Sequence, residues 1–169
     1  MLEDINVGRY LINYTLAAKD GHLVNMVGRQ EELERLIHIL MRSTKSNPII
    51  VGMNGIGKTA LIEGLIKFMG SSGAPAYLQE KEVIGIDIPR VMLDTKTESE
   101  YSELLKRLIQ VIVDSQKQKI LYIKDISLLV NTDTNPENKE AAKFFLERAN
   151  NNVGLIIPGI APLRDTFWG

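Results

Sequence analysis

The clearest chemical signature in this sequence is an eight-residue segment that matches the pattern G-x-x-x-x-G-K-[S/T]. Glycines let backbone N–H groups curl around a phosphate, and the N-terminus of a following helix adds its partial positive charge. Lys58 is placed to reach the outer phosphates, and the Thr59 hydroxyl is placed to bind magnesium. The alternative interpretation is a glycine-rich turn with a solvated lysine. The candidate nucleotide-binding residues are Gly52, Met53, Asn54, Gly55, Ile56, Gly57, Lys58, Thr59 and Ala60.

The elements that must position this segment follow from apolar periodicity. Strands are expected where short apolar runs meet turn residues, and helices where apolar residues recur at helical spacing. Thr97 and Glu100 form a capping box that opens a further helix. The alternation predicts an α/β fold, with a mainly parallel sheet and helices on both faces. The predicted strands are 48–51, 83–88, 120–123 and 153–157; the predicted helices are 30–42, 58–69, a helix from Thr97, and 135–149; the predicted loops are 70–75 and 131–138.

Composition narrows the function classes. The 169 residues favour one domain, and 20 Lys plus Arg against 21 Asp plus Glu argue against nucleic acid or an anionic membrane as the main partner. The absence of cysteine excludes disulfides, thiolate metal sites and a cysteine nucleophile, and His22 and His38 alone disfavour a histidine metal site. No secretory signal is evident, and no apolar run approaches the roughly 18 residues of a membrane span. We therefore expect a cytoplasmic protein.

Three groups of residues carry a family resemblance: the box Val27-Gly28-Arg29, the approach from Arg42 to Pro48, and the helix start Lys58-Thr59-Ala60 with Glu63-Gly64-Leu65. Together they resemble the first nucleotide-binding domain of Clp-type AAA+ unfoldases, most closely over residues 11–65. The resemblance implies a three-layer P-loop NTPase core of the AAA+ large-subdomain type over residues 23–169, without the helical lid. It also implies an N-terminal flanking segment over residues 1–22.

The resemblance further implies the ligands and partners. ATP or ADP is the expected nucleotide, with magnesium held through Thr59, and Met26 and Val27 are expected to line the adenine pocket. The alternative for these two residues is a place in the core. Arg29 is interpreted either as nucleotide-proximal or as a charge at a helix start. A homo-oligomer or a Clp-like partner protein is the expected assembly.

The sequence departs from this family where hydrolysis would occur. The resemblance implies a strand that ends in two acidic residues, one to orient magnesium and one to activate water. Here residues 120–123 are followed by Lys124 and Asp125. A lysine beside the magnesium site weakens metal binding through like-charge repulsion. Asp125 remains the candidate catalytic base, but it cannot replace the first acid, because successive strand residues face opposite sides. Alternatively, Lys124 pairs with phosphate or with Asp125 and makes binding less dependent on magnesium.

Two further departures concern other family segments. Thr97 and Ser99 replace the tyrosine and glycine of the family's pore loop, so peptide threading is not expected. Tyr101 is interpreted as a core residue at helical spacing. The strand 153–157 is followed by Pro158 and Gly159 instead of a polar sensor segment. The family's strand order would place the phosphate-loop strand at a sheet edge.

Intact binding chemistry beside altered catalytic chemistry predicts a module that binds ATP or ADP and hydrolyses it weakly or not at all. One alternative is an active ATPase module of an unfoldase, completed by further parts or partner subunits. The other alternative is a protein-interaction module that acts without nucleotide.

Overall fold

The computed structural model describes residues 6–23, 27–42, 49–51, 57–115, 118–124, 140, 143–144, 147–148 and 154–159. For residues 49–51 and 154–159 only the backbone is described.

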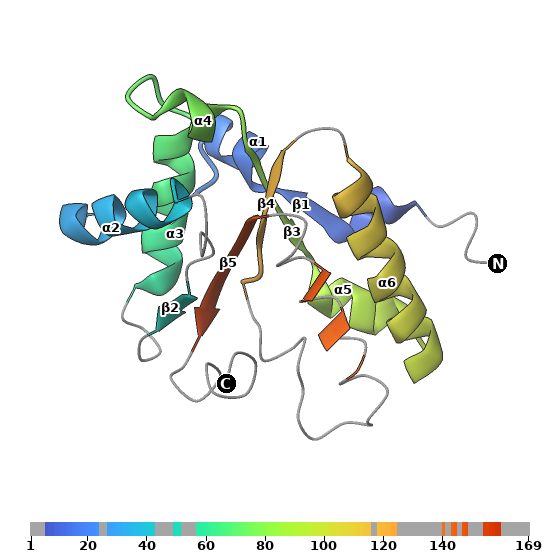
Figure 1. Ribbon diagram of the computed structural model, residues 1–169. Coiled ribbons are helices and arrows are strands. Elements are labelled where there is room, and N and C mark those ends of the chain that lie inside the picture. Colours follow the sequence, from blue (N-terminus) through green and yellow to red (C-terminus); the bar gives the residue numbers. More distant parts are fainter. Residues whose placement is uncertain are drawn as a thin grey trace.

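A five-stranded sheet forms the centre of the described structure (Figure 1). Its strands lie in the order β1 (Leu11–Asn13), β3 (Glu82–Ile86), β4 (Lys119–Tyr122), β5 (Gly154–Gly159) and β2 (Ile49–Val51). β3, β4, β5 and β2 pair in parallel, whereas β1 pairs antiparallel with β3. The predicted α/β class and the mainly parallel sheet are thus observed, and β2 lies at one end of the strand order, as expected.

Side chains of β3 and β4 alternate between two hydrophobic clusters. Val83, Ile120 and Tyr122 belong to one cluster, with side chains from α1 (Tyr14–Lys19), α2 (Gln30–Leu40), α3 (Lys58–Met69) and α4 (Ala76–Gln79). Ile84 and Leu121 belong to the other, with side chains from α5 (Ile88–Asp94) and α6 (Glu98–Asp114). Because strand residues alternate in direction, helices cover both faces of these strands.

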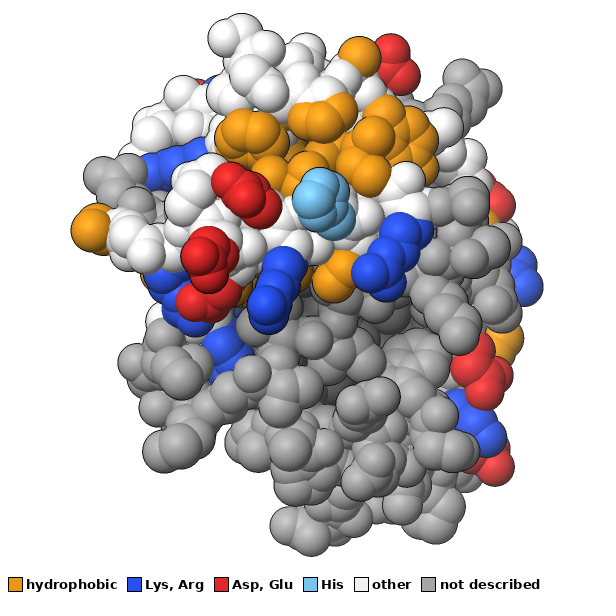
Figure 2. All heavy atoms as spheres, turned by 60° about the vertical axis from the view of Figure 1, so that its left-hand side comes forward, with side chains coloured by type: hydrophobic (Ala, Val, Ile, Leu, Met, Phe, Trp, Pro, Cys, Tyr) orange, Lys and Arg blue, Asp and Glu red, His pale blue; other side chains and the backbone are white. Residues whose placement is uncertain are grey.

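The helices follow the apolar periodicity closely. α3 occupies the predicted range, and Thr97 caps α6 through the complete capping box with Glu100. α2 buries Leu33, Leu36 and Leu40 on one face. Figure 2 shows charged side chains exposed on the side of the molecule that carries α2, beside an area of hydrophobic side chains. α2 is therefore an amphipathic helix with its apolar stripe on the core.

Strand boundaries differ from the prediction by one or two residues: β3 spans Glu82–Ile86, β4 spans Lys119–Tyr122, and β5 ends at Gly159. β3 ends at Ile86 because Asp87 accepts a hydrogen bond from the Arg90 N–H at 3.1 Å and caps α5, which was not predicted. β5 continues through Pro158 to Gly159, since a proline removes only a single N–H from the ladder. The loop predicted over 131–138 lies outside the described residues. Within the helix predicted over 135–149, the described residues are helical.

Part of the segment predicted to flank the domain packs into it. Leu11 pairs with Ile86 in the register of β1 on β3. The ring of Tyr14 lies against β3, where a Cβ at Gly85 would lie 2.5 Å from Tyr14 Cε2 and 2.9 Å from the Tyr122 carbonyl oxygen. Tyr10 and Tyr14 of this segment therefore belong to the core, and glycine at position 85 leaves space for the Tyr14 ring.

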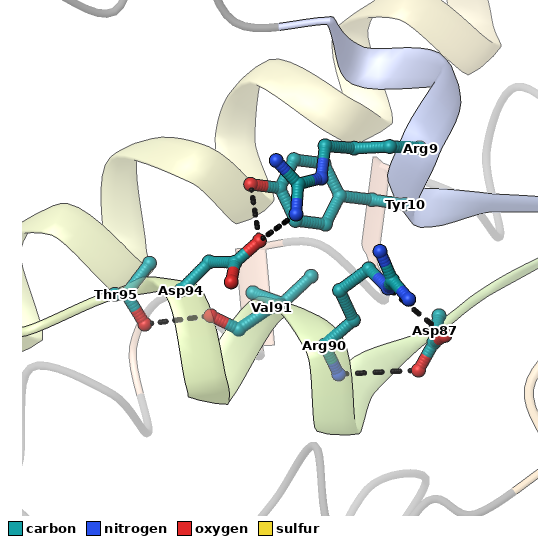
Figure 3. Close-up of polar contacts among 7 residues, drawn as sticks. All are labelled: Arg9, Tyr10, Asp87, Arg90, Val91, Asp94 and Thr95. Carbon is teal, nitrogen blue, oxygen red and sulfur yellow. Dashed lines mark hydrogen bonds and ion pairs between the residues drawn. The ribbon is translucent and has the colours of Figure 1, made fainter.

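The residues before β1 also anchor the end of α5 (Figure 3). In the 3-10 helix η2 (Val7–Tyr10), the Tyr10 hydroxyl donates to Asp94 Oδ2 at 3.0 Å, and Arg9 Nη2 lies 3.0 Å from the same oxygen. Burial raises the pKa of Tyr10, and the hydrogen bond to Asp94 adds to the rise. The N-terminal segment thus spans from α5 to the α3 side of the sheet.

A search of the described residues for a helix long and apolar enough to cross a membrane finds none.

Candidate phosphate-binding site

The start of α3 lies at the edge of the sheet where the parallel strands end. In open α/β sheets this carboxyl-end edge is where ligands bind. Gly57 is the N-cap residue of α3, with φ +92°, a conformation that residues with a Cβ rarely adopt. No side-chain hydrogen bond caps α3 at this residue. The first N–H groups of a helix need acceptors outside it, so a phosphate fits this position by both geometry and charge.

Lys58, Thr59 and Ala60 form the first turn of α3 and are half-buried. The partial positive charge of the α3 dipole therefore lies at this end of the helix. Gly52, Met53, Asn54, Gly55 and Ile56 lie outside the described residues. The structure therefore describes the helical end of the predicted phosphate loop.

Arg29 contacts this end of the loop, a role that sequence reasoning left open. Its Nη1 donates to the Gly57 carbonyl oxygen at 3.0 Å, and its Nη2 pairs with the Glu32 carboxylate. A Cβ at Gly57 would lie 2.9 Å from Arg29 Nη1. The guanidinium therefore fixes the direction of the peptide that opens α3. The spacing of Arg29 from Glu32 signals only their local ion pair, and no local pattern indicates the contact with Gly57.

A buried polar cluster adjoins Thr59. Tyr122, the last residue of β4, is 0% exposed, and its ring centroid lies 4.9 Å from that of Tyr14. Glu63, one turn after Thr59 on α3, is only 6% exposed. Burial raises the pKa of Tyr122 well above its ordinary value, Tyr14 and Glu63 raise it further, and the Thr59 hydroxyl lowers it. Thr59 is therefore a close neighbour of the Tyr122 hydroxyl, and Glu63 acts on it through its charge.

β4 is followed by Lys124 and Asp125, where the resemblance implies two acidic residues. Lys124 is exposed two residues beyond β4, and Asp125 lies outside the described residues. Within the part of the chain that the structure describes, no group of three or more His, Cys, Asp or Glu side chains is arranged to hold a metal ion.

The residues predicted to line an adenine pocket are described only in part. Met26 lies outside the described residues, whereas Val27 is 86% exposed. Such exposure does not fit the alternative that Val27 is a core residue. Val27 instead presents an apolar side chain next to Gly28 and Arg29, in the segment that leads to the phosphate loop.

The segment compared with a pore loop serves here as a helix start. Thr97 is the N-cap residue of α6, and the side chain of Lys96 is exposed. Tyr101 is 7% exposed within the hydrophobic cluster of α5 and α6, as its predicted core role requires.

Comparison with known proteins gives the family. The chain matches the family described as "SMAX1 nucleotide binding domain" over residues 23–164. It is 36% identical over 140 residues to chaperone protein ClpB 1 of Parasynechococcus marenigrum (strain WH8102), and 32% identical over 145 residues to heat shock protein hsp98 of Neurospora crassa. These alignments cover 83% and 86% of the chain but 16% of each relative. The chain thus spans about a sixth of the length of the curated relatives that it matches.

Solved structures agree with this relationship. An S. cerevisiae Hsp104-ADP complex matches with a TM-score of 0.79 and 26% identity, over 95% of this chain and 27% of that one. A closed-state reconstruction of Hsp104 with ATPγS and FITC casein also gives a TM-score of 0.79 at 26% identity, over 95% of this chain and 28% of that one. The resemblance to Clp-type AAA+ proteins is confirmed, and the chain belongs to the SMAX1 nucleotide-binding-domain family.

Proposed function

We propose that this domain binds ATP or ADP at the start of α3 and hydrolyses it weakly or not at all. The observation that carries the proposal is Gly57 in the left-handed conformation, followed at once by Lys58 and Thr59 in the first turn of α3. Oriented N–H groups, a helix dipole and a lysine together suit a polyphosphate. Gly52 to Ala60 would hold the phosphates, and Thr59 would give its oxygen to magnesium.

The adenine assignment rests on the family. One structural neighbour is described as an ADP complex and another as an ATPγS complex. The exposed Val27 would pack against the base together with Met26, because a flat aromatic ring is stabilised by apolar contact on its faces. The three-layer P-loop NTPase architecture is part of the same proposal.

Weak hydrolysis follows from the end of β4. Lys124 follows β4 at the position where the resemblance implies the acid that orients magnesium, and its side chain is exposed. Two positive charges repel each other most strongly where water is scarce. We expect Lys124 to reduce the contribution of magnesium and Asp125 to add little to turnover.

Calorimetric titration with ATP, with and without Mg²⁺, tests the proposal. Wild-type protein should bind, and Lys58→Ala should abolish binding because it removes the cation at the phosphates. Lys106→Ala is the matched control, since Lys106 is exposed on α6 and its Nζ lies 5.7 Å from the centroid of the exposed Phe144 ring. Steady-state turnover should be slow and unchanged in Asp125→Asn. Turnover at ordinary ATPase rates that this substitution abolishes would instead establish the active-ATPase alternative.

The edge position of β2 favours a second candidate, an interaction module that acts without nucleotide. Among the strands that the structure describes, β2 pairs only with β5, and an unpaired strand edge is a template for another chain. The same edge and the Clp family suggest a homo-oligomer or a Clp-like partner as the assembly, and a cytoplasmic location stays a prediction. A melting temperature that no nucleotide raises would favour this candidate, because a ligand at a hundredfold excess over its Kd stabilises by about 2.7 kcal/mol.

A further inference from the structure

The Tyr122 hydroxyl is a buried polar group, and its missing hydrogen-bond partner needs an explanation. Its oxygen has no hydrogen-bond partner among the described residues. Buried polar groups are nearly always paired, and leaving one unpaired costs about 1–3 kcal/mol. The hydroxyl adjoins Thr59 but does not meet hydrogen-bond geometry with it. Small movements at the start of α3 would complete this contact.

The chemistry of Thr59 indicates when the contact forms. A threonine hydroxyl has one proton, and when its oxygen gives a lone pair to a cation the proton needs an acceptor. Lys124, two residues beyond β4, provides only donors. The Tyr122 oxygen is an acceptor, and burial keeps its pKa raised, so the hydroxyl stays neutral at physiological pH and accepts without bringing a charge. Tyr122 is thus the neighbouring group suited to accept a hydrogen bond from the Thr59 hydroxyl.

We propose that the Tyr122 hydroxyl is a positioning group for the magnesium-nucleotide site, accepting a hydrogen bond from Thr59 Oγ1 when Thr59 engages magnesium and phosphate. The proposal rests on the function proposed above, and it gives the buried tyrosine a role that a phenylalanine of the same shape cannot fill. No charge develops at Tyr122. The tyrosine orients Thr59 and does not touch the nucleotide.

The packing around the ring supports a fixed position for the hydroxyl. The Tyr14 ring lies 4.9 Å from the Tyr122 ring at an interplanar angle of 58°, and Gly85 leaves the space that Tyr14 occupies. Aromatic pairs in tilted contact at this separation are favourable. The Tyr122 ring therefore cannot turn away without displacing Tyr14 of α1.

Tyr122→Phe removes the oxygen and keeps the ring, so it separates this role from a packing role. Without nucleotide, the variant should be as stable as wild type or more stable, because an unpaired buried hydroxyl is lost. Its affinity for Mg-ATP should fall about tenfold, equivalent to about 1.4 kcal/mol. Its affinity for ATP without Mg²⁺ should stay within about twofold of wild type. Tyr101→Phe, which removes a tyrosine hydroxyl in the other hydrophobic cluster, is the matched control and should change neither affinity.

A double-substitution cycle completes the test. In the Thr59→Val background, Tyr122→Phe should have no further effect on Mg-ATP binding, since the partner hydroxyl is gone. Wild-type binding with an unchanged Mg-ATP affinity in Tyr122→Phe would overturn this inference alone. Equal losses with and without Mg²⁺, or a loss of stability without nucleotide, would also overturn it in favour of a packing role. Absence of binding by wild type would overturn the proposed function together with this inference.

Discussion

Gly57 joins two requirements that no other residue type meets together. Its φ of +92° turns the chain into α3, and its carbonyl oxygen accepts the hydrogen bond from Arg29 Nη1. A Cβ at this position would both strain the backbone and lie 2.9 Å from that nitrogen. The backbone strain is the larger effect, because the guanidinium is the far end of a flexible side chain and can move.

We expect Gly57→Ala to lower the free energy of unfolding by about 1–3 kcal/mol, because alanine is strained at positive φ. Urea denaturation of the nucleotide-free protein measures this effect. Gly70→Ala is the matched control at the other end of α3, where φ is −83° and the nearest atom to a Cβ is 3.7 Å away. That change should be neutral or stabilise by up to about 1 kcal/mol. Equal effects of the two substitutions would contradict the assigned strain.

At the scale of elements, the start of α6 shows how a local sequence signal fixes a boundary. Thr97 Oγ1 accepts from the Glu100 N–H at 3.2 Å, and Glu100 Oε2 accepts from the Lys96 N–H at 2.7 Å and from the Thr97 N–H. These contacts satisfy N–H groups that α6 cannot satisfy internally. Thr97 therefore fixes the residue at which α6 begins.

Thr97→Ala should lower the free energy of unfolding by about 1 kcal/mol, the usual cost of losing an N-cap side chain. Chemical denaturation followed by circular dichroism measures the change. Ser99→Ala provides the comparison, since Ser99 is exposed in the same helical turn and should alter stability by less than about 0.5 kcal/mol. A loss at Ser99 as large as that at Thr97 would argue against the capping role.

At the scale of the whole molecule, buried tyrosines pack on both faces of the sheet. They connect the N-terminal segment with the sheet and the helices. Tyr14 and Tyr122 lie in the cluster of α1, α2 and α3, whereas Tyr10 and Tyr101 lie in the cluster of α5 and α6. Burial is the largest cause of a raised pKa at all four of these tyrosines, and it raises the pKa of Tyr101 to about 12. Each of them is thus held neutral in the folded protein beyond the pH at which the unfolded chain ionises.

Stability should consequently fall in alkaline solution. Below the unfolded pKa of about 10 these groups are neutral in both states; above it the unfolded chain loses protons that the folded protein keeps, which favours unfolding. Tyr101 alone should remove about 1.4 kcal/mol per pH unit between pH 10 and its folded pKa of about 12. Urea midpoints measured from pH 9 to 12 test this, and Tyr101→Phe should make the decline less steep. An unchanged pH dependence in that variant would show that Tyr101 is not shielded from water in solution.

The sequence by itself determined the elements whose signals are local. The apolar spacing and glycine punctuation gave α3 its range, the capping box gave α6 its start, and the strand-helix alternation gave the α/β class, because these patterns act within a few residues. The prediction that Gly57, Lys58 and Thr59 bind phosphate came from such a local pattern too.

Only the tertiary structure decided which distant residues meet. Arg29 reaches Gly57 across 28 positions, and Tyr10 reaches Asp94 across 84. The addition of β1 to β3 and the approach of Tyr122 to Thr59 likewise depend on how the strands are ordered in the sheet. Such contacts arise from burial and shape in the assembled core, and the periodicity of a single segment carries no information about which partner will complete it.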